Sequence, residues 1–214
     1  MSLDANVRRD ALALVDRYPV RRSALLPMLH LVQSIEGKVS PEGIAFCAEI
    51  LDLTTAEVAA VSSFYTMYTR HSTGKHHIGV CTNTMCGLLG GDAIWDAISA
   101  DLGAGHDETT EDGMFTLEKI ECQAACTHAP VVTIDWEYID DATVAMVRDF
   151  VGKLQRGEEV HATRGPVIRS LKDTERTIAG FEDGLENAPT IDAKMLAGLD
   201  AAKAAGTMLP ESQV

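Results

Sequence analysis

Apolar residues recur at intervals of three and four through the first sixty positions, which is the spacing of amphipathic helices. Polar residues, proline or glycine interrupt the pattern between segments, so four short helices are predicted. Each pair of helices has start or stop signals: Asp4, Ser23 and Gly37 for the first two, and Ser40-Pro41 and Thr54-Thr-Ala-Glu57 for the last two. Short helices with tight connections form bundles. We therefore expect a small helical bundle over residues 1–62.

The pattern changes after an aromatic run that begins at Phe64, where short strand-like segments alternate with helical ones. Strands are predicted at 76–80, 114–120, 131–134 and 136–139, and helices from an Asp92 cap to Gly103 and from Val144 to Gly157. The order strand, helix, strand, strand, helix predicts a small mixed sheet with helices packed on it. The expected fold class is α/β (α+β), with this second domain at residues 63–157.

The periodic signal fades beyond Gly157. Residues 158–214 hold several glycines and prolines, few aromatic residues and no sustained repeat of apolar positions, although 193–205 could form a weak helix. Such a segment has little apolar surface to bury. We expect an extended C-terminal tail that either stays mobile or drapes over a partner.

The charge of the chain narrows the range of partners. Among its 214 residues, 32 Asp and Glu outnumber 18 Lys and Arg, which gives a net charge of −14. An acidic surface repels nucleic acid and anionic lipid, so neither is expected as a partner. The first ten residues are too polar for a signal peptide, and no apolar run reaches the ~18 residues that a bilayer requires. Direct membrane insertion is therefore not expected.

Four of the five cysteines fall in two close pairs, Cys81 with Cys86 and Cys122 with Cys126. Each pair directly follows a predicted strand, so both can occupy loops at the same edge of the sheet. Paired cysteines in a protein without a secretion signal favour metal or redox chemistry over disulfides. Cys47 lies on the apolar face of a predicted helix, where a buried structural thiol is the expected role.

The spacing is compatible with more than one metal. Zinc accepts four thiolates and tolerates both the C-x₄-C and the C-x₃-C spacing. A 2Fe–2S cluster fits better, because its two irons can each take one pair, and a bare thiol pair is the third alternative. A plant-type ferredoxin would need a cysteine at Leu89, and a Rieske centre would need a further cysteine after Cys126. Neither pair is C-x-x-C, which disfavours a thioredoxin-type dithiol.

The neighbourhood of the cysteines is rich in small and polar residues. Segments 82–85 and 87–91 can direct backbone N–H groups toward the sulfurs. A four-thiolate cluster in an acidic chain resists an added electron, so a low reduction potential is expected. The glycines at 87–91 lack the G-x-G-x-x-G spacing, and there is no P-loop. We therefore expect no NADH or FMN site formed by this chain alone.

Several motifs resemble those of one protein family. They are Phe64-Tyr-Thr-Met67, Val80-Cys-Thr-Asn-Thr-Met-Cys86, Thr109-Thr-Glu-Asp-Gly113, Phe115-Thr-Leu117, Glu121-Cys-Gln-Ala-Ala-Cys126 and Ala129-Pro130. This set resembles the 24 kDa subunit family of NADH:quinone oxidoreductase (respiratory complex I) over roughly residues 5–170. The resemblance implies a thioredoxin-like 2Fe–2S domain at 63–157, with Cys81, Cys86, Cys122 and Cys126 as the cluster ligands and a cis peptide bond before Pro130.

The resemblance also implies a setting for the chain. Family members lie beside a partner subunit that binds FMN and oxidises NADH, near further iron–sulfur subunits, in the peripheral arm on the cytoplasmic face of the membrane. Equivalent subunits occur in NAD-reducing hydrogenases and NAD-dependent formate dehydrogenases, which remain alternatives. A zinc-stabilised structural module remains a third interpretation. The chain is thus expected to act as one subunit of an oxidoreductase, without a complete active site of its own.

Overall fold

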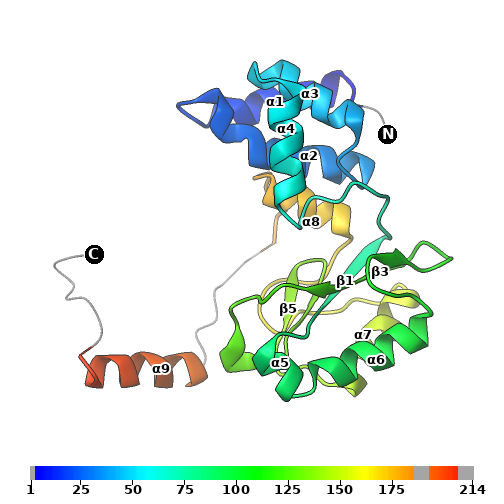
Figure 1. Ribbon diagram of the computed structural model, residues 1–214, viewed down its shortest axis with the longest axis vertical. Coiled ribbons are helices and arrows are strands. Elements are labelled where there is room, and N and C mark those ends of the chain that lie inside the picture. Colours follow the sequence, from blue (N-terminus) through cyan, green and yellow to red (C-terminus); the bar gives the residue numbers. More distant parts are fainter. Residues whose placement is uncertain (1–2, 186–192, 207–214) are drawn as a thin grey trace.

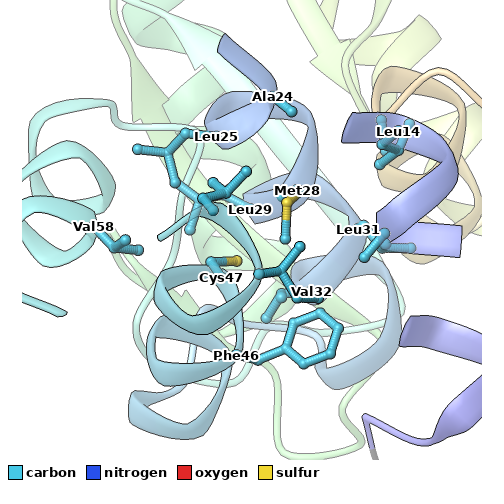
Figure 2. Close-up of a cluster of buried hydrophobic side chains, with 14 of the residues drawn as sticks. Leu14, Ala24, Leu25, Met28, Leu29, Leu31, Val32, Phe46, Cys47 and Val58 are labelled. Carbon is cyan, nitrogen blue, oxygen red and sulfur yellow. The ribbon is translucent and has the colours of Figure 1, made fainter. Parts of the chain in front are cut away.

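The computed structural model describes residues 3–185 and 193–206. The chain begins with a helical bundle (Figure 1) built from α1 (Ala5–Val15), α2 (Leu25–Glu36), α3 (Pro41–Leu51) and α4 (Thr55–Phe64). The apolar stripes predicted from the sequence meet in one core, in which Met28, Leu29 and Cys47 are fully buried. Figure 2 shows Cys47 lying among Leu29, Val32 and Met28. The predicted four-helix bundle is therefore confirmed.

Three of the predicted helix caps are confirmed. The Asp4 carboxylate accepts hydrogen bonds from two backbone N–H groups of the first turn of α1, and the Ser40 hydroxyl caps α3. Thr54 and Glu57 form a reciprocal capping box at the start of α4. The cap predicted at Ser23 is wrong, because Ser23 lies inside a 3-10 turn (Arg21–Ala24) that leads directly into α2.

The second part of the chain forms a five-stranded sheet in the order β2-β3-β1-β4-β5. Its strands are β1 (His76–Cys81), β2 (Glu108–Thr109), β3 (Phe115–Ile120), β4 (Val132–Ile134) and β5 (Glu137–Ile139). β1 and β3 are parallel, and the other neighbours are antiparallel. The short β2 lies between the helix predicted to end at Gly103 and the strand predicted at 114–120, where no strand was predicted. The four longer strands are where the apolar pattern predicted them.

Two long helices cover the sheet (Figure 1): α6 (Gly91–Leu102) and α7 (Val144–Gln155). Their apolar faces share one core with β1, β3 and β4, in which Ile78, Leu117 and Ile134 are fully buried. The predicted Asp92 cap is displaced by two residues, because Gly90 occupies the N-cap with a left-handed φ of 115°. The expected mixed α/β fold is confirmed.

The first part of the expected tail is ordered against the rest of this chain. Residues 161–167 pair with each other and, through Arg164, with Tyr138 of β5. Helix α8 (Leu171–Ile178) then packs on α2, between the bundle and the sheet (Figure 1). Leu171 and Glu175 are thus buried within the chain itself, and the expectation that the tail drapes over a partner stays a prediction.

The last described segment is helix α9 (Ala193–Ala204), which confirms the weak helix predicted there. Residues 186–192 and 207–214 of the expected tail lie outside the described residues. Among the helices of the described residues, none is long and apolar enough to cross a membrane.

Candidate metal centre

The two cysteine pairs meet at one edge of the sheet because β1 and β3 run parallel. Cys81 is the last residue of β1, and its register partner Ile120 is the last residue of β3. Cys122 follows Ile120 by two positions, so both cysteine-bearing loops leave the sheet at the same end. The sequence predicted this common edge from the strand pattern alone.

The first cysteine pair lies deep in the loop between β1 and α6. Cys81 and Cys86 are only 1% and 3% exposed. Cys86 lies in a short helix, α5 (Thr84–Leu88), that the sequence did not predict. Gly91 keeps this loop closed, because a Cβ at this position would lie 2.4 Å from the Cys81 carbonyl oxygen and 2.9 Å from that of Cys86. The buried pair is therefore held by backbone-to-backbone packing.

The second cysteine pair is exposed to solvent. Cys122 and Cys126 flank Ala124, which has a left-handed φ of 54° that is uncommon for a residue with a Cβ. The two sulfurs lie 3.9 Å apart. A 3-10 turn (Cys126–His128) follows, and the Ala129–Pro130 peptide bond is cis, as expected. The left-handed residue folds the loop back, which brings its two sulfurs together.

Hydrogen-bond donors reach both sulfurs of the buried pair. The Asn83 side-chain amide donates to Cys81 Sγ at 3.7 Å, and the Val131 backbone N–H donates to the Cys86 sulfur. The sequence predicted backbone N–H donors from segments 82–85 and 87–91, whereas the donors to these two sulfurs are the Asn83 side chain and the Val131 backbone. The signal for Val131 was its position immediately before a strand that pairs with β1, which sets this N–H beside the first cysteine loop. Such donors stabilise negative charge on thiolates.

The thiol pKa values reflect close packing of the sulfurs. Burial raises the pKa of Cys86 to about 11, the Val131 N–H opposes this rise, and neighbouring Cys81 and Cys126 add to it. The hydrogen bond with Cys122 raises the pKa of Cys126, and the nearby Cys81 acts in the same direction. Sulfurs from both loops therefore influence one another. With its pKa at about 11, Cys86 keeps its proton when no metal is bound, so metal binding to Cys86 must release that proton.

The donor set suits a centre that uses two thiolates per metal. Two sulfurs bound at ~2.3 Å to one tetrahedral metal lie about 3.8 Å apart, and the Cys122 and Cys126 sulfurs are 3.9 Å apart. Within the described ranges, no group of three or more His, Cys, Asp or Glu side chains is arranged around a single ion. The exposed pair thus has the spacing that one tetrahedral metal ion requires.

The other candidate residues have structural partners. His76 Nδ1 lies 2.5 Å from the buried Asp135 carboxylate, and His77 Nε2 lies 2.8 Å from Glu118. Both histidines are therefore held by carboxylates of the same chain. Cys47 is buried in the bundle, where burial raises its pKa to about 12. It lies in a different hydrophobic core from Cys81 and Cys86.

A family model described as thioredoxin-like [2Fe-2S] ferredoxin matches residues 11–155, which is more than half of the chain. The chain belongs to this family. The family supports an iron–sulfur cluster as the cofactor. It also supports the resemblance seen in the sequence motifs.

Curated relatives match most of the chain. The E-type subunit of the NADH-quinone oxidoreductase of Mycobacterium tuberculosis is 48% identical over 206 residues, covering 93% of this chain and 80% of the relative. NADH-quinone oxidoreductase subunit 2 of Thermus thermophilus is 37% identical over 153 residues, covering 70% of this chain and 84% of the relative. The resemblance to complex I subunits is thereby confirmed.

A solved structure shares the fold. An NAD+-reducing [NiFe]-hydrogenase in the air-oxidized state aligns with a TM-score of 0.54 at 17% identity. The alignment covers 61% of this chain and 23% of the hydrogenase chain. At this identity the likeness describes the fold alone.

Proposed function

We propose that this chain is the iron–sulfur electron-transfer subunit of an NADH:quinone oxidoreductase and holds one 2Fe–2S cluster through Cys81, Cys86, Cys122 and Cys126. The observation that carries the proposal is the arrangement of the two cysteine pairs, which leave the ends of two parallel, register-matched strands. Close relatives named as subunits of that enzyme support the oxidoreductase.

Each loop has a distinct part in holding the cluster. Cys81 and Cys86 supply one pair of thiolates from a buried loop whose donors are the Asn83 amide and the Val131 N–H. Cys122 and Cys126 supply the other pair from an exposed loop with its sulfurs at metal-binding separation. The cluster itself supplies reversible one-electron chemistry. The exposed loop gives an electron donor close approach, while the buried loop excludes water from the other side.

The electron source is a partner subunit that binds FMN and oxidises NADH. The acidic chain carries no dinucleotide fingerprint or P-loop, so both cofactors belong to the partner. Neighbouring iron–sulfur subunits complete the assembly, in the peripheral arm of a membrane-bound complex at its cytoplasmic face. The chain reaches the membrane through these partners.

The shared fold with an NAD+-reducing hydrogenase favours one alternative function, as the corresponding part of a hydrogenase of that kind. Purification of the tagged chain from its host, together with its natural partners, distinguishes the complex I function from the hydrogenase function. A flavin-bearing subunit together with quinone-reducing subunits supports the complex I assignment. Recovery with a nickel-containing subunit supports the hydrogenase.

The decisive experiment mixes the cluster-loaded chain with the separately purified flavin-bearing subunit and adds NADH anaerobically. The visible bands of the chain should bleach within the mixing time of a stopped-flow instrument, and a reduced-cluster EPR signal should appear. The chain alone with NADH should show no change, because it holds no flavin. One result would contradict the proposal: the flavin is reduced by NADH, but the cluster of this chain stays oxidised both with NADH and with dithionite.

A further inference from the structure

A cleft of 520 Å³ lies between the helical bundle and the sheet, and we call it the junction cleft. The bundle side contributes Tyr65 and Tyr68, and the sheet side contributes Trp136 and Tyr138. Volumes of this size are typical of binding sites, and they occur preferentially where two structural units meet. Residues 65–68 of the aromatic run therefore line one side of the cleft, whereas Phe64 does not.

The polar lining of the junction cleft is acidic. Glu118 and Glu121 both face it, and none of its twelve lining residues is Lys or Arg. Glu118 contacts His77, and Glu121 is exposed. The whole chain has a net charge of −14, so the potential around the cleft is negative as well. Charge complementarity favours a cationic occupant.

The aromatic walls suit the same occupant. Tyr65 is 45% exposed and lines the cleft, and an exposed aromatic ring can bind a cation on its face. The chain already makes this contact nearby, because the Arg164 guanidinium lies 4.4 Å from the ring centroid of Tyr138. A carboxylate can pair with the charged end of a lysine or arginine side chain, while a neighbouring aromatic face packs against its apolar stem.

A buried carboxylate holds both walls of the cleft in position. Glu175 of α8 is fully buried, and its carboxylate accepts from Trp136 Nε1 at 3.1 Å and contacts His30 Nδ1 at 2.5 Å. His30 and Trp136 both line the cleft, from the bundle and the sheet respectively. One carboxylate thus holds the two walls at a fixed separation. A pre-formed cleft loses little conformational entropy when it is occupied.

The cleft adjoins the exposed cysteine loop. Glu121 and Gln123 line it, and these residues flank Cys122. A second hollow of 340 Å³ shares Glu118 and Glu121 with the cleft and adds Arg70 and Lys119, which a cationic occupant would avoid. The cation is therefore expected between Glu121 and Trp136, on the side of Glu121 away from Arg70 and Lys119 and beside the loop that holds Cys122.

From these contacts we infer that the junction cleft is a docking site for a lysine or arginine side chain of the flavin-bearing partner, which anchors the partner beside the exposed cysteine loop. This inference rests on the proposed function, since it names a contact of the same partner. It assigns the aromatic residues and Glu121 to binding, and it gives Glu175 a positioning part.

The test measures the dissociation constant of the cluster-loaded full chain for the purified flavin-bearing subunit by biolayer interferometry, at low and high salt. Tyr65→Ser removes an aromatic wall, and Phe64→Ser is its matched control, because Phe64 is 78% exposed but does not line the cleft. Tyr65→Ser should weaken binding about 10-fold or more, as for an aromatic interface anchor. Phe64→Ser should change it by less than about 3-fold.

The charge test uses Glu121→Lys, with Glu111→Lys as its control. Both residues are exposed, and Glu111 precedes β3 whereas Glu121 follows it, so the two lie at opposite ends of that strand. Glu121→Lys should weaken binding about 10-fold or more at low salt and reduce the salt dependence, because a charge pair is replaced by a repulsion. The iron content and EPR spectrum of each variant establish that the cluster is retained.

The outcomes separate the two proposals. Weakened binding for Tyr65→Ser and Glu121→Lys, with both controls near wild type, supports the docking site. Wild-type affinity for Tyr65→Ser, or tighter binding for Glu121→Lys, overturns the docking site and leaves the proposed function intact. If the wild-type chain does not bind the flavin-bearing subunit at all, the partner in the proposed function is wrong, and the docking site falls with it.

Discussion

The two cysteine loops have similar spacing in the sequence but opposite environments in the structure. The first loop places Cys81 and Cys86 in a buried cluster with Ile120 and Val131 and is closed by backbone packing at Gly91. The second loop exposes both of its cysteines and includes the left-handed Ala124. One loop is therefore a rigid frame, and the other is the accessible side of the site. Spacing alone does not distinguish these two parts.

The largest expected effect is on the stability of the first cysteine loop, which is the rigid frame of the site. Gly91→Ala places a methyl group 2.4 Å from the Cys81 carbonyl oxygen, which only a backbone shift can relieve. We expect a loss of about 3 kcal/mol in the free energy of unfolding and failure to retain the cluster. Denaturant titration and iron analysis measure both.

The matched control for this substitution is Gly152→Ala, in the middle of α7, where the added methyl group meets only the end of the Arg156 side chain. It should leave the cluster intact and raise stability by up to about 1 kcal/mol. If the two variants behaved alike, the first loop would not be the rigid frame.

The second expected effect is a difference in thiol reactivity. In the cluster-free chain, iodoacetamide should modify Cys122 and Cys126 about 100-fold faster than Cys81 and Cys86 at pH 8, because the reagent reaches the exposed pair and not the buried pair. Burial raises the pKa of Cys86 to about 11, so its rate should keep rising through pH 9. Peptide mass spectrometry at timed intervals gives the four rates. Equal modification rates for the two cysteine pairs would contradict the distinction between a rigid first loop and an accessible second loop.

A third test asks whether the helical bundle influences the difference in thiol reactivity between the two cysteine pairs. Glu175→Ala leaves His30 and the Trp136 N–H without their buried partner, which should cost about 3 kcal/mol in unfolding free energy. Glu182→Ala is the exposed control nearby and should cost little. The ratio of thiol rates should stay unchanged in both variants. A Glu175→Ala chain with equal thiol rates would show that the bundle, and not Gly91, maintains the frame.

The smallest expected effect concerns the accessible loop. Ala124→Gly relieves a left-handed backbone at φ 54° and should raise stability by about 0.5–1 kcal/mol. Ala125→Gly is the control, because Ala125 has an ordinary negative φ of −102°, and it should lower stability. Thermal unfolding of the cluster-free chains provides the comparison. Stabilisation by both substitutions would mean that the loop is not held in the observed conformation.

The sequence was sufficient where a local pattern carries the structural information. Helix caps such as Asp4 and Thr54 act within one turn, and the strands that end at Cys81 and before Cys122 follow from their apolar runs. The common edge of the two cysteine pairs could therefore be predicted. The cis peptide bond before Pro130 followed only from the family resemblance.

The sequence was insufficient where a distant contact decides the structure. Six of the eight residues of α8 are polar, so its pattern is typical of a solvated segment. Its key contact is the buried carboxylate of Glu175 on His30, which lies 145 residues away in the chain. The burial of one cysteine pair and not the other likewise depends on how Gly91 and Val131 pack, which the motif spacing does not contain.

The central claim is that both loops bind one 2Fe–2S cluster, and it is tested most directly by iron and sulfide counts and EPR on anaerobically purified chain. We predict two irons and two sulfides per chain, and an EPR signal that appears only after dithionite reduction. Serine at any of Cys81, Cys86, Cys122 or Cys126 should lower the iron content, whereas Cys47→Ser should not. A colourless chain that contains zinc and takes up no iron on reconstitution, or full iron content after loss of one of the four cysteines, would contradict the account.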